Sequence, residues 1–256
     1  MRIKLLGAHN LESESSRLVS LLIDDILAID AGSLTSGLSF AAQQRLKAVI
    51  LTHQHYDHIR DIAALSINLY SHGDTIEVYS IQVVYDTLAS YVLNDILYPN
   101  FLERPPENPT IKFHTLETGK TELIAGYSVL PVTVTHVVDT IGLQITSTEG
   151  KKIFFTSDTG PGLTECWQQI SPDLLITEVT TCNGNEDFAR NSGHLTPNLL
   201  QQELESFRNL KGYLPQIVLV HMTPMQEKEI KSEIAAVAKN LNAEIRLGYE
   251  GMQIEL

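Results

Sequence analysis

The stretch Thr52-His53-Gln54-His55-Tyr56-Asp57-His58 places three imidazoles and one carboxylate within six residues, directly after an apolar run. His53 and His55 lie two positions apart, so both side chains can approach one metal ion from an extended or turning segment. Asp57 and His58 follow where a helix is expected to begin, and can approach a second ion. These ligands suit zinc, iron or manganese, and an ion with an open position activates water near neutral pH. The alternative, a chance cluster of surface histidines, is disfavoured because this cluster is internal and follows a buried-strand pattern.

Three further apolar runs end on a metal-capable residue, namely His136, Asp158 and His221. Residues at the ends of neighbouring strands converge in space, and clefts beyond strand ends commonly hold ligands. Taken alone, each of these histidines could belong to the core or the surface, and Asp158 could serve a turn. The joint pattern favours two ions that share one carboxylate, with Asp158 as the natural bridge. The candidate metal ligands are His53, His55, Asp57, His58, His136, Asp158 and His221.

His194 lies in the segment Ser192-Gly193-His194-Leu195-Thr196-Pro197, between a predicted loop over 180–193 and a predicted helix. A helix start is a favourable place for an anion. A histidine there could bind a phosphate oxygen or protonate a departing alkoxide, and a capping role is the alternative. We therefore interpret His194 as a substrate-binding and catalytic residue. The remaining histidines have no ligand-like neighbours and are predicted to be structural: His9, His72 and His114.

Composition describes an ordinary globular protein, with 43% hydrophobic and 19% charged residues. The net charge of −13 argues against a nucleic-acid partner, because a phosphate backbone requires a Lys/Arg footprint. No stretch predicts a membrane span or a signal peptide, so a cytoplasmic location is expected. The only two cysteines, Cys166 and Cys182, suit a reducing compartment, with a single disulfide as the alternative. The oligomeric state stays open, a homodimer being one option.

Apolar and alternating runs predict one β-rich domain over residues 1–256 with several helices. Helices are expected over 58–70 and 80–93 and after two Thr-Pro starts, at Thr196-Pro197 and Thr223-Pro224. Residues 1–6 and 18–22 are expected to pair antiparallel, with Asp24-Asp25 as the turn into the next strand. The proline-rich segment 99–109 is a predicted loop. Strands are predicted over 2–7, 17–23, 26–30, 48–52, 75–79, 111–116, 121–124, 127–135, 141–146, 152–156, 174–177, 217–220 and 252–256.

The order His-x-His-x-Asp-His, then His136, Asp158 in Ser-Asp-Thr, and finally His221 resembles the metallo-β-lactamase superfamily over nearly the whole chain. The resemblance implies an α+β fold, a four-layered αββα sandwich with a dimetal site at one edge. It also implies that His53, His55 and His136 hold one metal, that Asp57, His58 and His221 hold the other, and that Asp158 lies between them.

Within the superfamily, Gly193-His194-Leu195-Thr196-Pro197, the segment 91–101 and Ile176-Thr177-Glu178 resemble the class II cyclic nucleotide phosphodiesterases. Ribonuclease Z is the next nearest relative. The sequence departs from the class II pattern at Ser157, where Gly is usual, and at Tyr56, where Leu is common. Both side chains stand between ligands and therefore concern substrate fit more than metal binding.

The resemblance implies that a hydroxide bridging the two divalent or trivalent metals, with zinc favoured and iron or manganese as alternatives, hydrolyses a small phosphodiester. The expected substrate is cAMP or cGMP and the product a nucleoside 5′-monophosphate, with His194 and Asp57 as catalytic residues. Three alternatives stay open: a ribonuclease Z-like nuclease, hydrolysis of a thioester, lactone or β-lactam, and a metal-stabilised binding module without activity. The negative charge argues against the nuclease, and the complete ligand set argues against the inactive module.

Overall fold

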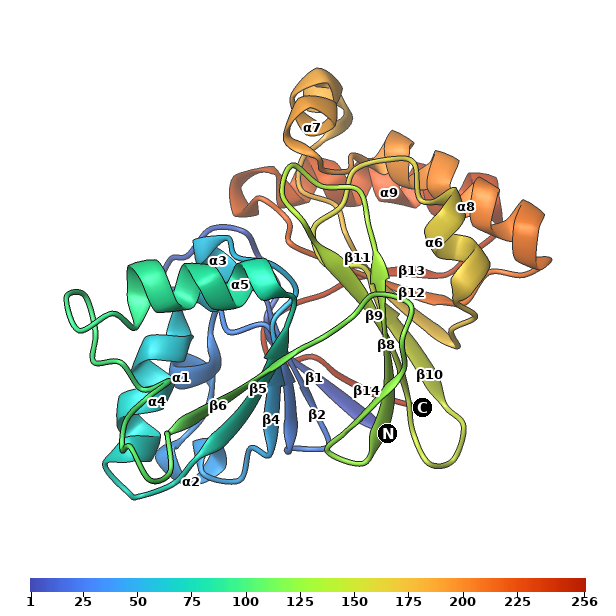
Figure 1. The fold of residues 1–256 in the computed structure, drawn as a ribbon. Helices are drawn as coiled ribbons and strands as arrows, with labels where there is room; N and C mark the ends of the chain where they lie inside the picture. Colours follow the sequence, from blue (N-terminus) through green and yellow to red (C-terminus); the bar gives the residue numbers. More distant parts are fainter.

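The computed structural model describes residues 1–256 as two seven-stranded mixed sheets packed face to face, with helices on both outer faces (Figure 1). This is the expected four-layered αββα sandwich. The first sheet has the order β14(Gln253–Glu255), β1(Arg2–Gly7), β2(Ser20–Ile23), β3(Leu27–Ile29), β4(Ala48–Ile50), β5(Ile76–Ser80), β6(Ile111–Thr115). The second has the order β13(Ile245–Leu247), β12(Gln216–Val220), β11(Leu174–Glu178), β10(Lys152–Phe155), β9(Ile141–Thr146), β8(Tyr127–Thr133), β7(Glu122–Ile124).

Each sheet is antiparallel on one side and parallel on the other. In the first sheet β1, β2 and β3 form the predicted meander, and Asp24 and Asp25 turn the chain with φ of 46° and 61°. From β3 to β6 the strands run parallel. In the second sheet β10 to β13 run parallel. The carboxyl ends of parallel strands meet at one edge, so each sheet offers a row of loops there.

Helices cover the outer faces, and three apolar clusters hold the layers together. The cluster of 25 buried residues between the sheets takes side chains from both of them, including Leu5 and Phe155. Figure 1 shows α4 and α5 over the first sheet and α6, α8 and α9 over the second. The helices are α1(Leu34–Gly37), α2(Phe40–Gln43), α3(Tyr56–Ile59), α4(Asp61–Tyr70), α5(Gln82–Thr87), α6(Thr164–Gln169), α7(Glu186–Ser192), α8(Pro197–Lys211) and α9(Glu227–Leu241), with a π-helical turn at Leu88–Val92.

The predicted helix over 58–70 begins earlier and is divided at Arg60 into α3 and α4. The division has a hydrogen-bonding cause, because the amide of Asp61 donates to Ala31 O at 2.8 Å instead of extending the ladder of α3. The amide of Ala31 in turn donates to His58 O at 2.6 Å. The end of β3 is therefore bound to the segment that carries the histidine motif.

The prediction of a loop over 180–193 is wrong in part, because the segment contains a 3₁₀ turn at Asn183–Asn185 and the helix α7. Acidic residues in the first turn of α7 and a left-handed cap at Gly193, with φ of 69°, stabilise this short helix despite its Asn and Gly content. The strand β13 and the helix α6 were also unpredicted. Cys166 and Cys182 are both free and buried. None of the helices has the length and apolarity needed to cross a membrane.

Candidate metal centre

The candidate residues meet at the edge where the strand ends of both sheets face each other. Three residues there adopt the left-handed backbone conformation: Asp30 after β3, Ser157 after β10 and His221 after β12, with φ between 56° and 62°. This conformation is unfavourable for residues with a Cβ, and it persists where the surrounding structure holds it. The turns redirect the chain abruptly and carry the side chains of Asp158 and His221 into the space between the sheets.

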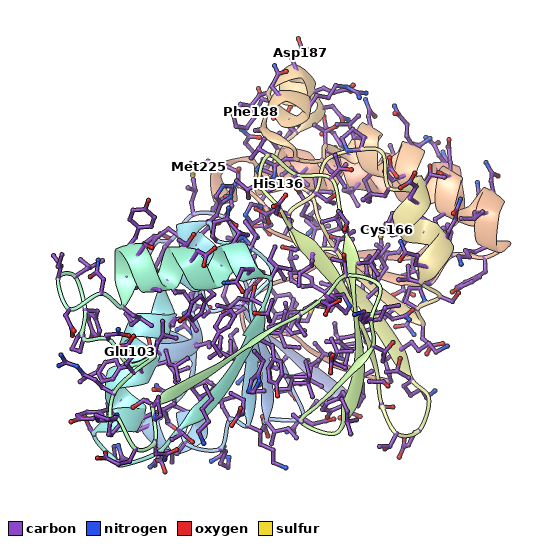
Figure 2. All side chains as sticks on the ribbon, viewed as in Figure 1. Glu103, His136, Cys166, Asp187, Phe188 and Met225 are labelled. Atoms are coloured by element: carbon purple, nitrogen blue, oxygen red, sulfur yellow. The ribbon has the colours of Figure 1, made fainter.

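Two groups of four potential ligands form there, and each takes two residues from each half of the chain; a third group of three, Glu178, His194 and His221, adjoins the second through His221. The first group is His53, His55, His136 and Asp158; the second is Asp57, His58, Asp158 and His221. Within a group all ligand atoms lie within 4.8 Å of one another. Asp158 belongs to both groups, as a bridging carboxylate would. Figure 2 shows His136 at this edge, below α7.

Distances show how closely the nitrogens and oxygens approach. In the first group His136 Nε2 lies 3.3 Å from His55 Nδ1, and His53 Nε2 lies 3.8 Å from Asp158 Oδ2. In the second group Asp158 lies 3.3 Å from both His58 Nε2 and His221 Nε2. Asp57 Oδ2 is 3.2 Å from His221 Nε2.

Hydrogen bonds on the far side of each ring set its tautomer. His53 Nδ1 lies 3.1 Å from Thr52 Oγ1, His58 Nδ1 lies 2.8 Å from Asp30 Oδ2, and His136 Nδ1 lies 2.8 Å from Gly193 O. His221 Nδ1 lies 2.8 Å from Thr180 Oγ1. Since the Thr180 hydroxyl donates to Glu178 Oε2 at 2.7 Å, it must accept from His221. In all four rings Nδ1 is the donor; Nε2 of His53, His136 and His221 presents its lone pair to the centre, whereas Nε2 of His58 keeps a proton until a cation displaces it.

The donor set fits metal ions because two of the buried ring nitrogens that face the centre lack partners. His53 Nε2 and His58 Nε2 are fully buried and make no aligned hydrogen bond. A buried nitrogen lone pair without a partner is unfavourable, and a coordinated cation would satisfy it. Two groups of four nitrogen and oxygen ligands, with Asp158 common to both, are consistent with a site for two metal ions. They leave the identity of the metal open.

Electrostatics divide the histidines into two kinds. Burial, reinforced by the neighbouring His58, holds the pKa of His53 well below its usual value. Burial also lowers the pKa of His55 and His136, so these rings are neutral and ready to coordinate. Burial opposes protonation of His58 as well, but the carboxylates of Asp158 and Asp30 outweigh it and hold the pKa of His58 well above its usual value.

His194 stands beside the two groups and is held by a buried acid. Its Nδ1 lies 2.7 Å from Glu178 Oε1, and the carboxylate of Glu178 also accepts the amides of Thr159 and Leu195. Burial opposes protonation of His194, but Glu178 outweighs it and raises the pKa of His194 to about 9. The ring of His194 stacks on that of His221, with centroids 5.4 Å apart. No hydrogen bond within the protein involves its Nε2, and the residue lines the cavity that opens onto the centre.

Two glycines allow the backbone to come this close to the centre. A Cβ at Gly32 would lie 2.3 Å from Asp57 O, which no side chain can occupy. A Cβ at Gly193 would lie 3.0 Å from His136 Nδ1, and Gly193 also adopts the left-handed conformation. Glycine at both positions therefore lets the loops pack directly on ligand-bearing segments.

A cavity of about 620 Å³ opens onto the centre. His55, Asp57, Asp158, His194 and His221 form its floor. Its walls come from the loop after β1 and from α3, and they include Asn10, Leu11, Glu12, Leu18, Tyr56 and Arg60. This volume lies in the range of small-molecule sites.

All seven predicted ligands and His194 converge at this edge, and their chemical roles stay predictions. His9, His72 and His114 lie outside both groups. Residues that hold the rings were not singled out from the sequence, above all Asp30 and Thr180. Asp30 ends a strand and precedes Gly32, which is the only signal that could have drawn attention to it. Glu178 was named from the sequence only as part of Ile176-Thr177-Glu178, one of the segments that carry the family resemblance, and was given no role.

Known proteins resemble this chain in sequence or in fold. A family profile described as "Beta-lactamase superfamily domain" matches residues 27–222. A 3′,5′-cyclic-nucleotide phosphodiesterase from Schizosaccharomyces pombe is 25% identical over 138 residues, which cover 54% of this chain and only 37% of that protein. Unliganded yeast PDE1 superposes with a TM-score of 0.84 at 18% identity over 100% of this chain and 99% of its own.

Two further solved structures show the same fold. The metallo-β-lactamase fold protein YhfI from Bacillus subtilis has a TM-score of 0.78 at 17% identity, and it covers 100% of this chain and 99% of its own. The short form of human tRNase Z has a TM-score of 0.69 at 18% identity with the same coverage. At these identities the structural likenesses establish the fold alone.

We predict two bound metal ions per chain, measured by elemental analysis of protein purified with metal supplementation. Asp158→Ala should reduce the amount of metal bound by both ligand groups because the carboxylate of Asp158 belongs to both. His53→Ala should reduce it mainly in one group. His72→Ala, which removes an exposed histidine bonded to Asn68 O, is the matched control and should change nothing. A wild-type content of one equivalent or less would contradict the prediction.

Metal binding to the metal-free protein should release a proton at neutral pH. The raised pKa of His58 means that its ring carries a proton that an incoming cation must displace. Affinity should therefore fall as the pH is lowered through the neutral range. Calorimetric titration in two buffers with different ionisation enthalpies measures the released protons, and identical heats in both buffers would rule the displacement out.

Proposed function

The chain belongs to the metallo-β-lactamase superfamily of hydrolases, and from that premise we propose that it is a dimetal phosphodiesterase. Its proposed substrates are 3′,5′-cyclic nucleotides, which it would convert to nucleoside 5′-monophosphates. The observation that carries the proposal is the Glu178–His194 pair beside both ligand groups. The likeness to the fission yeast enzyme and to yeast PDE1 supports the choice of cyclic nucleotides.

His53, His55 and His136 would hold one ion, and Asp57, His58 and His221 the other, with Asp158 shared. When bound, such ions supply Lewis acidity toward phosphoryl oxygens and lower the pKa of coordinated water toward neutrality. Glu178, Asp30, Thr52 and Thr180 orient the surrounding rings through the hydrogen bonds described above.

Hydrolysis of a cyclic phosphodiester breaks the bond between phosphorus and O3′ and adds the oxygen of water to phosphorus. The departing O3′ must gain a proton, and His194 Nε2 would donate it. The pKa of His194, raised by Glu178 against the effect of burial, keeps this proton in place at neutral pH. Asp57, whose side chain is 28% exposed in the cavity, would accept the proton of the attacking water.

Other reactions agree less well with these features. The fold is shared with tRNase Z, but the net charge of −13 disfavours a polyanionic RNA substrate. Hydrolysis of a thioester, lactone or β-lactam would leave the Glu178–His194 pair without a purpose. A binding module without activity would not require eight converging side chains with their rings individually oriented.

A panel of substrates tests the proposal on metal-loaded protein. We expect turnover of bis(p-nitrophenyl) phosphate and of at least one of cAMP and cGMP, with the 5′-monophosphate as the product seen by chromatography. Precursor tRNA should be cleaved more slowly than the cyclic nucleotides. Faster cleavage of precursor tRNA would favour the nuclease, and no turnover of any phosphodiester would refute the proposal.

His194→Ala should lower kcat for cyclic nucleotides by roughly 10²–10⁴-fold, the range for loss of a general acid, while metal content is retained. The loss should be much smaller for bis(p-nitrophenyl) phosphate, because p-nitrophenolate leaves readily without a proton. His114→Ala, at an exposed position on β6, is the control and should behave as wild type. Equal slowing of both substrates would instead indicate an electrostatic contact to the phosphate, and loss of metal would indicate a ligand.

A further inference from the structure

One wall of the cavity combines an aromatic ring with a paired cation and anion. Tyr56 and Arg60 are one helical turn apart at α3, so their side chains lie on the same face. Both line the cavity, and Glu12 faces them from the loop after β1. Tyr56 is 69% exposed, whereas His55 and Asp57 on either side of it are partly buried. An exposed aromatic ring in a cavity wall is available for stacking.

Arg60 is held firmly by a buried partner. Its Nε donates to Asp61 Oδ1 at 2.9 Å, and Asp61 Oδ2 accepts both the amide and the hydroxyl of Thr35 at 2.8 Å. Asp61 is only 5% exposed. The guanidinium is therefore fixed in orientation, with Nη1 donating to Glu12 and Nη2 left without a protein partner.

Glu12 lies on a loop that is closed at its base. The amide of His9 donates to Arg17 O at 3.0 Å, and the amide of Arg17 donates to Glu250 Oε1 at 2.9 Å. Asn10 Nδ2 donates to Thr223 Oγ1 at 3.0 Å. The side chain of Glu12 remains 42% exposed, and a carboxylate accepts more hydrogen bonds than the one that Arg60 supplies.

We infer that this wall binds the nucleobase of the substrate and favours guanine over adenine, an inference that rests on the proposed cyclic-nucleotide phosphodiesterase function. The base would lie against the ring of Tyr56. The Watson–Crick edge of guanine presents the acceptor O6 beside the donors N1–H and N2–H₂. Arg60 Nη2 donates to O6, and the carboxylate of Glu12 accepts from N1–H and N2–H₂.

Adenine does not match the same pair of groups. Its edge offers one donor, N6–H₂, beside the acceptor N1, and has no amino group at C2. A carboxylate that accepts from N6–H₂ then faces the lone pair of N1, and one of its hydrogen bonds is lost. Sites built to hydrogen-bond a group reject analogues that lack it. A well-formed bidentate contact discriminates bases by about tenfold or more.

Binding and turnover together test the inference. The equilibrium affinities of 5′-GMP and 5′-AMP are measured by calorimetry, with and without metal, and kcat/KM is measured for cGMP and cAMP. The variants are Glu12→Gln, Tyr56→Leu and, as a matched control on the same loop, Glu14→Gln. Glu14 lies outside the cavity wall. Circular dichroism confirms that each variant is folded.

We expect wild type and Glu14→Gln to prefer the guanine compounds by about tenfold or more. Glu12→Gln should reduce the guanine-to-adenine preference several-fold. Tyr56→Leu should weaken the binding of both 5′-GMP and 5′-AMP and leave that preference unchanged. Equal affinity for GMP and AMP, or a preference that survives in Glu12→Gln, overturns the inference. Hydrolysis of both cyclic nucleotides at equal rates would overturn it while the proposed function stands. Guanine preference in binding without cyclic-nucleotide turnover would support the base site and refute the function.

Discussion

A buried polar atom must have a partner, and this requirement governs the end of the molecule where the sheets meet. Imidazoles and carboxylates are gathered there at positions that solvent barely reaches; His53 and His58 are fully buried. Neighbouring oxygens satisfy the Nδ1 atoms of four rings, while the buried Nε2 atoms of His53 and His58 have no partner within the protein. The protein alone completes only half of this network, which is the physical basis for assigning a metal centre.

Thr52 joins the two sheets at this point. Its hydroxyl accepts from Ser157 Oγ at 2.7 Å and donates to the carboxylate of Asp30 at 3.0 Å. Its carbonyl accepts the amide of Ile141 at 3.1 Å. The interface between the sheets is apolar elsewhere, so this small polar junction fixes the register of one sheet against the other at the position where the ligands must meet.

Sequence patterns predicted what is local in this structure. The spacing of His53, His55, Asp57 and His58 is readable because neighbours in the chain remain neighbours in the fold, and the periodicity of apolar residues predicted most strands. Thr196 caps α8 as predicted, whereas the helix expected at Thr223-Pro224 begins as a 3₁₀ turn over Pro224–Gln226 and becomes α9 only at Glu227. The superfamily and its αββα layers were confirmed. The roles of the individual ligands remain predictions.

Structural features that depend on contacts between distant segments were not predicted from the sequence. Asp30 orients His58 from 28 positions away, and nothing in its local sequence distinguishes it from an ordinary strand end. The division of the helix at Arg60 follows from the hydrogen bond between the Asp61 amide and Ala31 O. Helix propensities cannot predict this bond, because it joins residues that are distant in the sequence. The helix α7 formed within a segment rich in Asn and Gly because acidic residues in its first turn and the left-handed Gly193 at its C-terminal end stabilise it.

Each ligand group takes half of its members from each half of the chain, and this has a mechanical consequence. An ion bound in either group would tie together segments far apart in sequence, and because the group exists only in the folded chain, its binding free energy would add to the stability of the native state. The same ions that would serve catalysis would also hold the two sheets together at the edge that carries the ligands. Loss of metal would then weaken the contacts between the two sheets first at the edge that carries the ligands, while the apolar cluster between the sheets keeps them packed elsewhere.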